Sequence, residues 1–230
     1  MTFIQRSYQA ELLDAEDIPF EAIERNMQEL NTINTLLGGH AITVKGIAQL
    51  IGNLQEIHIC EIGCGGGDNL IAINKYCQQK HIKVHFAGID IKQTCIDFAA
   101  RKTDLQPNTD WIVSDYQQVY FDTKPDIIFS SLFCHHFTNE QLITQLQWMQ
   151  ENAKIGFLIN DLHRNSIAYY SIKMITKLFS RSYLVKNDAP LSVARGFTQP
   201  EWVDLFIKSG IKKYTITWQW AFRFLIIYKH

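Results

Sequence analysis

An acidic residue leads a glycine-rich loop in the pattern Glu61-x-Gly63-x-Gly65-x-Gly67. Glycines let a backbone turn sharply and approach a ligand without interference from a Cβ atom. An acid two residues before the first glycine would repel a pyrophosphate, but it suits an ammonium group. About 20 residues further on, at the spacing of a ribose-binding acid, Asp90 could accept hydrogen bonds from both hydroxyls of a ribose. The pattern therefore indicates a ligand that carries an ammonium group and a ribose.

Two adjacent histidines, His135 and His136, follow the apolar segment 125–132. An imidazole titrates near neutral pH and can accept a phenolic proton, so each is a candidate general base. Successive side chains of an extended segment point in opposite directions, so we expect only one to face a substrate, and we favour His136 slightly. The alternative is that both are structural and that one caps the helix expected over 139–149.

Further polar residues follow the apolar segment 155–159. Asp161 could orient a histidine or bind the substrate, and His163 is a second candidate base. Arg164 could neutralise an anionic group on a substrate. These residues are expected to face the same cleft as the two histidines.

A metal site is the other chemistry to consider at Cys134-His135-His136. Adjacent ligands strain a tetrahedral site, and no C-x-x-C or H-x-x-x-H pair is evident that would complete one. The sequence therefore predicts no metal.

The elements that position these residues are read from hydrophobic periodicity. The order strand, glycine loop, helix over 57–76 is that of the nucleotide half-site of a doubly wound α/β fold. The fourth and fifth strands, expected over 125–132 and 155–159, adjoin in such a sheet, so their carboxyl ends share a cleft. Further strands are expected over 84–89, 111–115, 125–132 and 155–159, and a terminal hairpin over 211–228.

The acid-led glycine loop, with Asp90 at its spacing, resembles the first motif of class I S-adenosylmethionine-dependent methyltransferases. The resemblance implies a Rossmann-like, doubly wound sheet of seven mostly parallel strands with an antiparallel last strand. In that family the glycines lie against the methionine moiety, and the acid after the second strand holds the ribose. An acid after the third strand, often followed by a bulky residue, contacts the adenine, and Asp115 and Tyr116 match those positions.

The cofactor implied by this resemblance is S-adenosylmethionine. A glycine loop that binds nothing is the alternative, and Asp115 could instead be a turn-forming carboxylate. The residues expected to bind the cofactor are Glu61, Gly63, Gly65, Gly67, Asp90, Ile91, Asp115, Tyr116 and Ser131.

Two regions lie outside that motif set. Residues 1–55 are expected to form an N-terminal helical cap, with helices over about 20–37 and 41–51, before a methyltransferase domain at 56–230. An insert at about 162–197 is expected to form a lid, with a mobile loop at 187–191. Its helix over 167–179 would turn an apolar side toward an aromatic or acyl substrate, although a solvated or membrane-surface helix is the alternative. That side comprises Ile167, Tyr170, Met174, Ile175 and Leu178.

Composition and charge give no support to several classes of function. With 230 residues and a formal net charge of -1, the chain has no overall field that favours nucleic acid or an anionic membrane. The five cysteines form no C-x-x-C pair, which favours a reducing, cytoplasmic compartment. The apolar stretch 218–228 is too short to span a membrane and contains Arg223.

The predicted function is methyl transfer to a small aromatic or polyketide-like molecule, at a phenolic or enolic oxygen. An Asp and a His before a long insert resemble small-molecule methyltransferases found with polyketide pathways. No Asn/Asp-Pro-Pro-aromatic motif follows strand four, which argues against amino methylation of DNA. The base would be His136 or His135, helped by His163 and Asp161. Alternatives are C-methylation of an activated ring and a non-catalytic S-adenosylmethionine-binding protein, as a monomer or homodimer.

Overall fold

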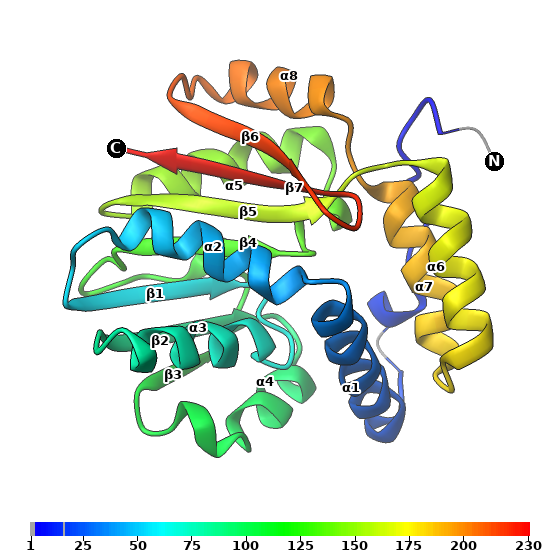
Figure 1. The fold of residues 1–230 in the computed structure, drawn as a ribbon, viewed down its shortest axis with the longest axis horizontal. Helices are drawn as coiled ribbons and strands as arrows, with labels where there is room; N and C mark the ends of the chain where they lie inside the picture. The colour runs from blue at the N-terminus through cyan, green and yellow to red at the C-terminus, as the bar shows by residue number, and fades with distance from the viewer. Residues whose placement is uncertain (1–2, 16) are drawn as a thin grey trace.

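The apolar segments of the sequence form the strands of one seven-stranded sheet in the computed structural model, which describes residues 3–15 and 17–230 (Figure 1). Residues 1, 2 and 16 of the predicted N-terminal cap lie outside this description. The strand order is β3-β2-β1-β4-β5-β7-β6, and only β7 runs antiparallel to its neighbours, as predicted. The strands are β1 (Glu56–Ile62), β2 (Lys83–Asp90), β3 (Thr109–Val113), β4 (Ile127–Ser131), β5 (Gly156–Leu162), β6 (Tyr214–Gln219) and β7 (Arg223–Lys229).

Each face of the sheet is covered by helices, because side chains alternate along a strand and the central strands are apolar on both sides. In β1, Ile59 packs with α2 (Gly39–Ile51) and α3 (Asp68–Gln79), whereas Cys60 packs with α5 (Asn139–Asn152) and α8 (Gln199–Ser209). The helix α4 (Gln93–Ala100) packs beside β2 and β3. The five cysteines are buried free thiols within this core.

Capping residues set several helix boundaries. The helix α1 (Phe20–Leu36) ends before Gly38, which adopts a left-handed conformation with φ 75°. Thr138 caps α5, since its hydroxyl accepts a hydrogen bond from the backbone N–H of Gln141. The alternative that a histidine caps this helix is therefore wrong.

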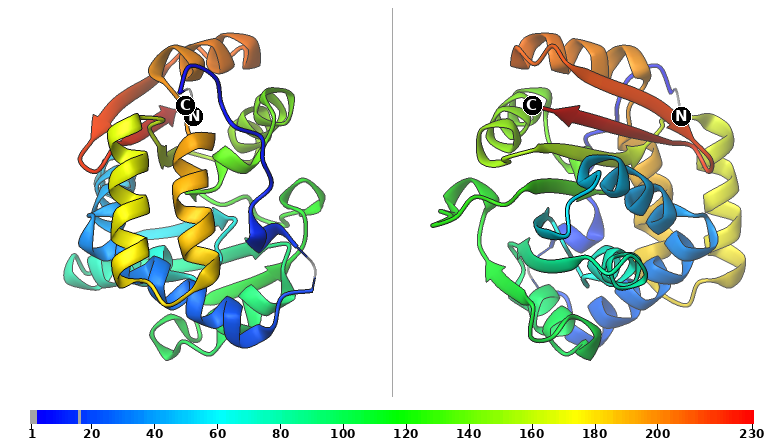
Figure 2. Two further views of the ribbon diagram at one scale, coloured as in Figure 1. Left: turned by 90° about the vertical axis from the view of Figure 1, so that its right-hand side faces the viewer. Right: turned by 60° about the vertical axis from the view of Figure 1, so that its left-hand side comes forward.

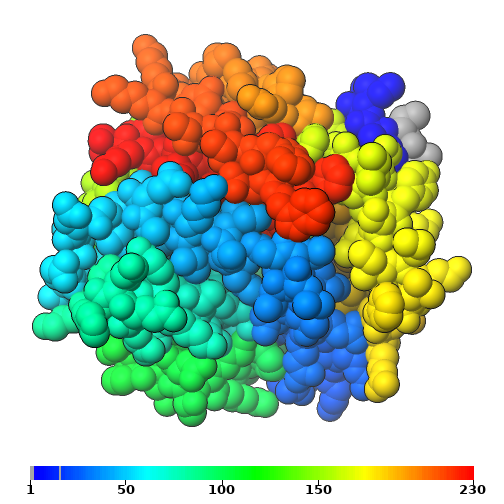
Figure 3. All heavy atoms as spheres, in the orientation of Figure 1, coloured from blue at the N-terminus to red at the C-terminus, as the bar shows by residue number. Residues whose placement is uncertain are grey.

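Three helices gather at the edge of the sheet where the parallel strands end. Figures 1 and 2 show α1, α6 (Ser166–Phe179) and α7 (Tyr183–Arg195) there, with α6 and α7 side by side. The N-terminal segment runs along α7 and contains one turn of 3-10 helix, η1 (Leu12–Asp14). In the space-filling view, atoms of α1 and α6 adjoin over this edge (Figure 3). Among the described residues, no helix combines the length and apolar character that crossing a bilayer requires.

The mobile loop expected at 187–191 is instead part of α7. Its Asn, Asp and Pro residues are typical of a turn, but Ser182 caps the helix and Pro190 lies inside it. Burial of Leu184, Val185 and Leu191 against the rest of the fold outweighs a helix penalty of about 3 kcal/mol for an interior proline.

The face of α6 that packs inward also differs from the prediction. Smaller side chains, Ala168, Ile172 and Thr176, are buried, which lets α6 approach α7 closely. Of the predicted inward residues, only Ile175 lines the cavity described below. The others are exposed to solvent: Ile167, Tyr170, Met174 and Leu178.

Asp188 attaches the N-terminal segment to α7, because its carboxylate accepts hydrogen bonds from the backbone N–H groups of Leu12 (2.8 Å) and Leu13 (2.9 Å). We expect Asp188→Ala to lower the free energy of unfolding by about 1–2 kcal/mol, as for loss of a helix cap. Thermal unfolding measures this as a Tm shift of roughly 2–4 °C per kcal/mol. Asp122→Ala, in an exposed loop, is the matched control, and an equal Tm in both variants would contradict the attachment.

Candidate active site

The glycine loop after β1 adopts backbone conformations that only glycine tolerates well. Gly63 has φ 66° and Gly67 has φ 72°. A Cβ atom on Gly63 would lie 2.2 Å from Cδ2 of Phe133, and one on Gly67 would lie 2.8 Å from the Trp111 ring. Aromatic rings therefore cover these two positions, whereas a Cβ atom on Gly65 would have no neighbour within 4 Å, so the loop is open at Gly65.

Glu61 is a buried carboxylate with an unused oxygen. It is 1% exposed, and its Oε1 accepts a hydrogen bond from Nδ2 of Asn69 (2.8 Å), whereas Oε2 has no partner among the described residues. Burial raises the pKa of this carboxyl well above its usual value, and Asp68 and Asp90 raise it further. A cationic ligand group placed here would supply the missing partner.

Asp90 ends β2 and holds the glycine loop in place. Its Oδ2 accepts the backbone N–H of Gly65 (2.9 Å), and its Oδ1 accepts that of Lys92 (2.9 Å). Burial raises its pKa, although these two hydrogen bonds partly offset the effect. Each carboxylate oxygen has a second lone pair, so ribose hydroxyls could still bind.

Asp115 and Tyr116 lie after β3, as predicted. The Asp115 carboxylate accepts the backbone N–H of Gln117 (3.0 Å), so it forms a turn and also lines a cavity. Tyr116 packs edge-on against Phe133, Phe137 and Trp148, and burial raises its pKa to about 12.

One cavity of about 670 Å³ joins these positions to the histidines. Every predicted cofactor-binding residue lines it except Gly67, including Ile91 and Ser131. Side chains of α1, α6 and α7, of the N-terminal segment and of the β6–β7 turn form much of the rest of its lining. The cavity therefore extends from the predicted cofactor-binding residues into a chamber between these segments.

The two histidines both face this cavity, contrary to the expectation from an extended segment. They lie in a turn of 3-10 helix, η4 (Cys134–His136), which stacks their rings with centroids 4.5 Å apart. His135 is 3% exposed, and its Nδ1 lies 2.8 Å from Oδ1 of Asp161. His136 is 25% exposed, so it is the more accessible of the two.

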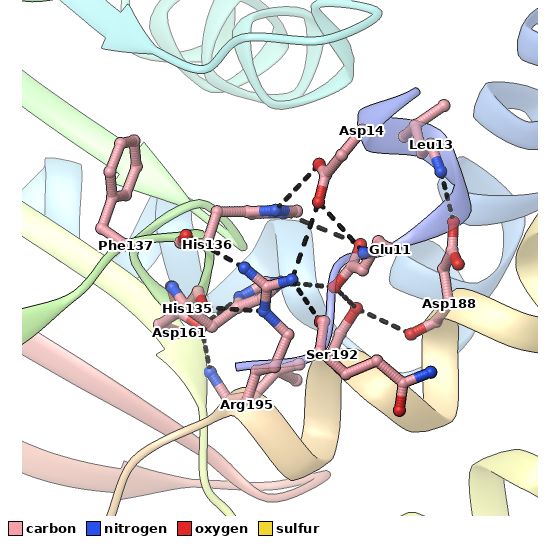
Figure 4. A network of polar contacts seen from close by, with 12 residues as sticks. Glu11, Leu13, Asp14, His135, His136, Phe137, Asp161, Asp188, Ser192 and Arg195 are labelled. Atoms are coloured by element: carbon pink, nitrogen blue, oxygen red, sulfur yellow. Dashed lines mark hydrogen bonds and ion pairs between the residues drawn. The ribbon is translucent and has the colours of Figure 1, made fainter. Parts of the chain in front are cut away.

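Acids from the N-terminal segment complete the cluster (Figure 4). Oxygens of Glu11 lie 3.7 Å from Nε2 of His135 and 3.8 Å from Nε2 of His136. Asp14 lies 3.5 Å from Nδ1 of His136. Sequence patterns did not indicate either acid, because both precede the first long helix in a segment without periodicity.

Burial raises the pKa values of the carboxyl groups around the histidines, and pairing with the histidines lowers them. Burial raises the pKa of Glu11, with partial compensation by His136. Burial alone would raise the pKa of Asp161, but His135 and the backbone N–H of Leu162 hold it below its usual value. Asp161 is therefore an ionised acceptor, so the Nδ1 atom of His135 is the donor.

Two buried arginines hold the backbone of the histidine turn. Arg195 donates to the carbonyl oxygens of His135 (3.1 Å) and His136 (2.9 Å), and Arg6 donates to that of Phe137 (3.0 Å). These charge-assisted bonds fix where the two rings point.

Glu11, His135 and His136 offer three ligand atoms within 4.8 Å of one another, a group that could hold a divalent metal ion. The prediction of no metal did not include Glu11, because no sequence pattern placed that residue beside the histidines. It stays a prediction.

His163 and Arg164 are not brought to the cavity. His163 packs against the Phe224 ring, with centroids 4.9 Å apart, and it is not a lining residue. Arg164 forms an ion pair with Glu201, with Nη2 2.7 Å from Oε1, and it donates hydrogen bonds to backbone carbonyl oxygens.

Comparison with solved structures finds related folds. The plantazolicin methyltransferase BpumL in complex with SAH is 22% identical to this chain, with a TM-score of 0.62. The aligned region covers 87% of this chain and 73% of the BpumL chain. A SAM-dependent methyltransferase from Aquifex aeolicus is 16% identical, with a TM-score of 0.62, covering 92% and 98%. Magnesium protoporphyrin IX methyltransferase from Synechocystis with bound SAM is 14% identical, with a TM-score of 0.56, covering 86% and 81%.

A family comparison adds the sequence evidence. Residues 59–156 match a family described as a methyltransferase domain, and this span contains every predicted cofactor-binding residue. Residues 59–156 therefore resemble a methyltransferase domain, and the chain as a whole has the fold of S-adenosylmethionine-dependent methyltransferases. Among curated proteins, the comparison found no match.

The substitution Glu61→Gln separates the predicted cofactor binding from stability. We expect the affinity for S-adenosylmethionine to fall about tenfold or more, because a charged hydrogen-bond partner is lost. Since the folded pKa of Glu61 is raised, its ionised form destabilises the free protein as pH rises through that pKa, and glutamine removes this penalty. The free variant should therefore unfold at the same or a higher Tm at pH 7.

Calorimetry with the cofactor and thermal unfolding without it measure the two effects. Glu56→Gln, at an exposed position of the same strand, is the control. Unchanged cofactor affinity in Glu61→Gln would contradict this role.

Proposed function

We propose that this methyltransferase methylates a phenolic or enolic oxygen of a small molecule, with His136 as the general base. The observation that carries the proposal is the position of His136 at the cavity wall, 25% exposed and flanked by Glu11 and Asp14. His135 is nearly enclosed, so its role is to position its neighbour.

The enclosure of the cavity supports a small acceptor. Helices α1, α6 and α7 and the N-terminal segment surround the chamber next to the cofactor groove. Proteins of similar fold are named for plantazolicin and for magnesium protoporphyrin IX, neither of which is a macromolecular substrate. We propose that residues 1–55 and the insert at about 162–197 cover the acceptor and exclude water from it.

The chemistry requires deprotonation and alignment. Bound S-adenosylmethionine supplies an electrophilic methyl group for in-line displacement. His136 accepts the proton of the acceptor hydroxyl, and the oxygen lone pair then forms the new bond to the methyl carbon as the carbon–sulfur bond breaks. Glu11 and Asp14 stabilise the imidazolium that results.

We expect His136→Ala to lower turnover by about 10²- to 10⁴-fold, the usual contribution of a general base, while cofactor affinity is unchanged. Transfer of a radiolabelled methyl group to a panel of phenols measures turnover. His163→Ala is the matched control, because this histidine does not line the cavity, and it should retain activity. Equal turnover in His136→Ala and wild type would rule out the base, and absence of any labelled acceptor would favour a binding protein without turnover.

We expect treatment with a chelator to leave turnover unchanged, because proton transfer through His136 requires no ion. The measurement is the same labelling assay before and after dialysis against EDTA. Loss of activity that zinc, manganese or magnesium restores would instead assign Glu11, His135 and His136 to a metal.

A further inference from the structure

Arg223 is a buried arginine without an ion pair among the described residues. It begins β7, is 3% exposed and lines the cavity. Its Nη2 donates to Oδ1 of Asn34 (2.7 Å), but Nε and Nη1 have no hydrogen-bond partner. An unpaired buried charge of this kind is costly, so its retention points to a ligand.

The other buried arginines have their charge or their donors satisfied. Arg164 pairs with Glu201, and Arg195 pairs with Asp14 and donates to three carbonyl oxygens. Arg6 uses all three of its guanidinium nitrogens, on backbone carbonyl oxygens and on Asn139. Arg223 is therefore distinct within the described part of the chain.

Within residues 3–15 and 17–230, no nearby acid is free to neutralise Arg223. Asp161 attracts it and raises its pKa, but burial lowers that pKa more, to about 10, so the guanidinium remains charged at neutral pH. The residue opposite Arg223 on β5 is Leu162, whereas Asp161 points to the other face and binds His135.

The surroundings of the guanidinium add to its positive potential. It packs against the start of α2, since a Cβ atom on Gly39 would lie 3.1 Å from Cζ of Arg223. In the described part of the chain no side chain caps this helix end, where the peptide dipoles direct their positive end. An anion near Arg223 would be stabilised by both.

Apolar side chains form much of this chamber, although Asn34 and Ser171 also line it. The apolar lining includes Ile33 of α1, Leu37 directly after α1, Ile172 of α6, Val193 of α7 and Phe222. A ligand that fills it would therefore combine an apolar body with one anionic group.

We propose that the acceptor of this methyltransferase is an apolar carboxylic acid whose carboxylate binds Arg223. The proposal rests on the function proposed above and names its substrate class. The sequence suggested Arg164 as the partner of an anionic group. We assign that role to Arg223 instead, because its Nε and Nη1 atoms have no hydrogen-bond partner among the described residues.

The test uses 3-hydroxy-5-pentylbenzoate and its carboxamide as probes, bound to the full chain saturated with S-adenosylhomocysteine so that no turnover is needed. Calorimetry should show that wild type binds the acid about 10- to 100-fold more tightly than the amide, as for hydrogen bonds to a charged group. Arg223→Met should abolish this preference, and Arg223→Lys should restore part of it. Arg181→Met, at an exposed position, is the control and should retain the preference.

Thermal unfolding distinguishes a role of Arg223 in anion binding from a role in stabilising the fold. Replacing an unpaired buried charge with an apolar side chain should leave the Tm of Arg223→Met unchanged or higher. Equal binding of acid and amide by wild type, failure of both to bind, or an acid preference that survives in Arg223→Met would overturn the proposal. An acid preference without methylation of any phenol would instead sustain the anion site and refute the proposed reaction.

Discussion

The hydrogen bond between Asp161 and His135 is the interaction on which the arrangement of the catalytic cluster depends. Asp161 is fully buried near the end of β5, where a carboxylate is stable only with a charged or donating partner. His135 supplies that partner from the turn after β4. The bond joins the ends of two neighbouring strands, and it fixes the ring on which His136 stacks.

The N-terminal segment couples the cluster to the helices above it. Glu11 reaches the histidines while its carboxylate also accepts a hydrogen bond from Ser192 of α7 (2.7 Å). Asp188, one turn earlier on α7, holds the backbone of η1. The segment, α7 and the histidine turn therefore form one connected unit, so a movement of α7 would displace the acids beside His136.

Charge is distributed unevenly around the cavity. Among the described residues, Glu61 presents a carboxylate oxygen without a partner beside Asn69, and Arg223 presents two nitrogens without a partner beside Asn34 and Gly39. Both groups carry a solvation cost in the free protein that a ligand of opposite charge relieves. Such a polarised cavity selects the orientation of what it binds as well as its size.

The sequence by itself determined the glycine loop, the acids at the end of β2 and after β3, and most helix boundaries, whereas the sheet topology was expected from the family resemblance. These features depend on local spacing, because a φ above zero, a helix cap or a period of two residues is specified within a few positions. Only the tertiary structure decided which face of α6 is buried, that 187–191 is helical, and that Glu11 and Arg223 reach the cavity. Those outcomes depend on packing between segments far apart in the chain, where burial outweighs local propensity and where no local pattern records which partner a charged side chain will have.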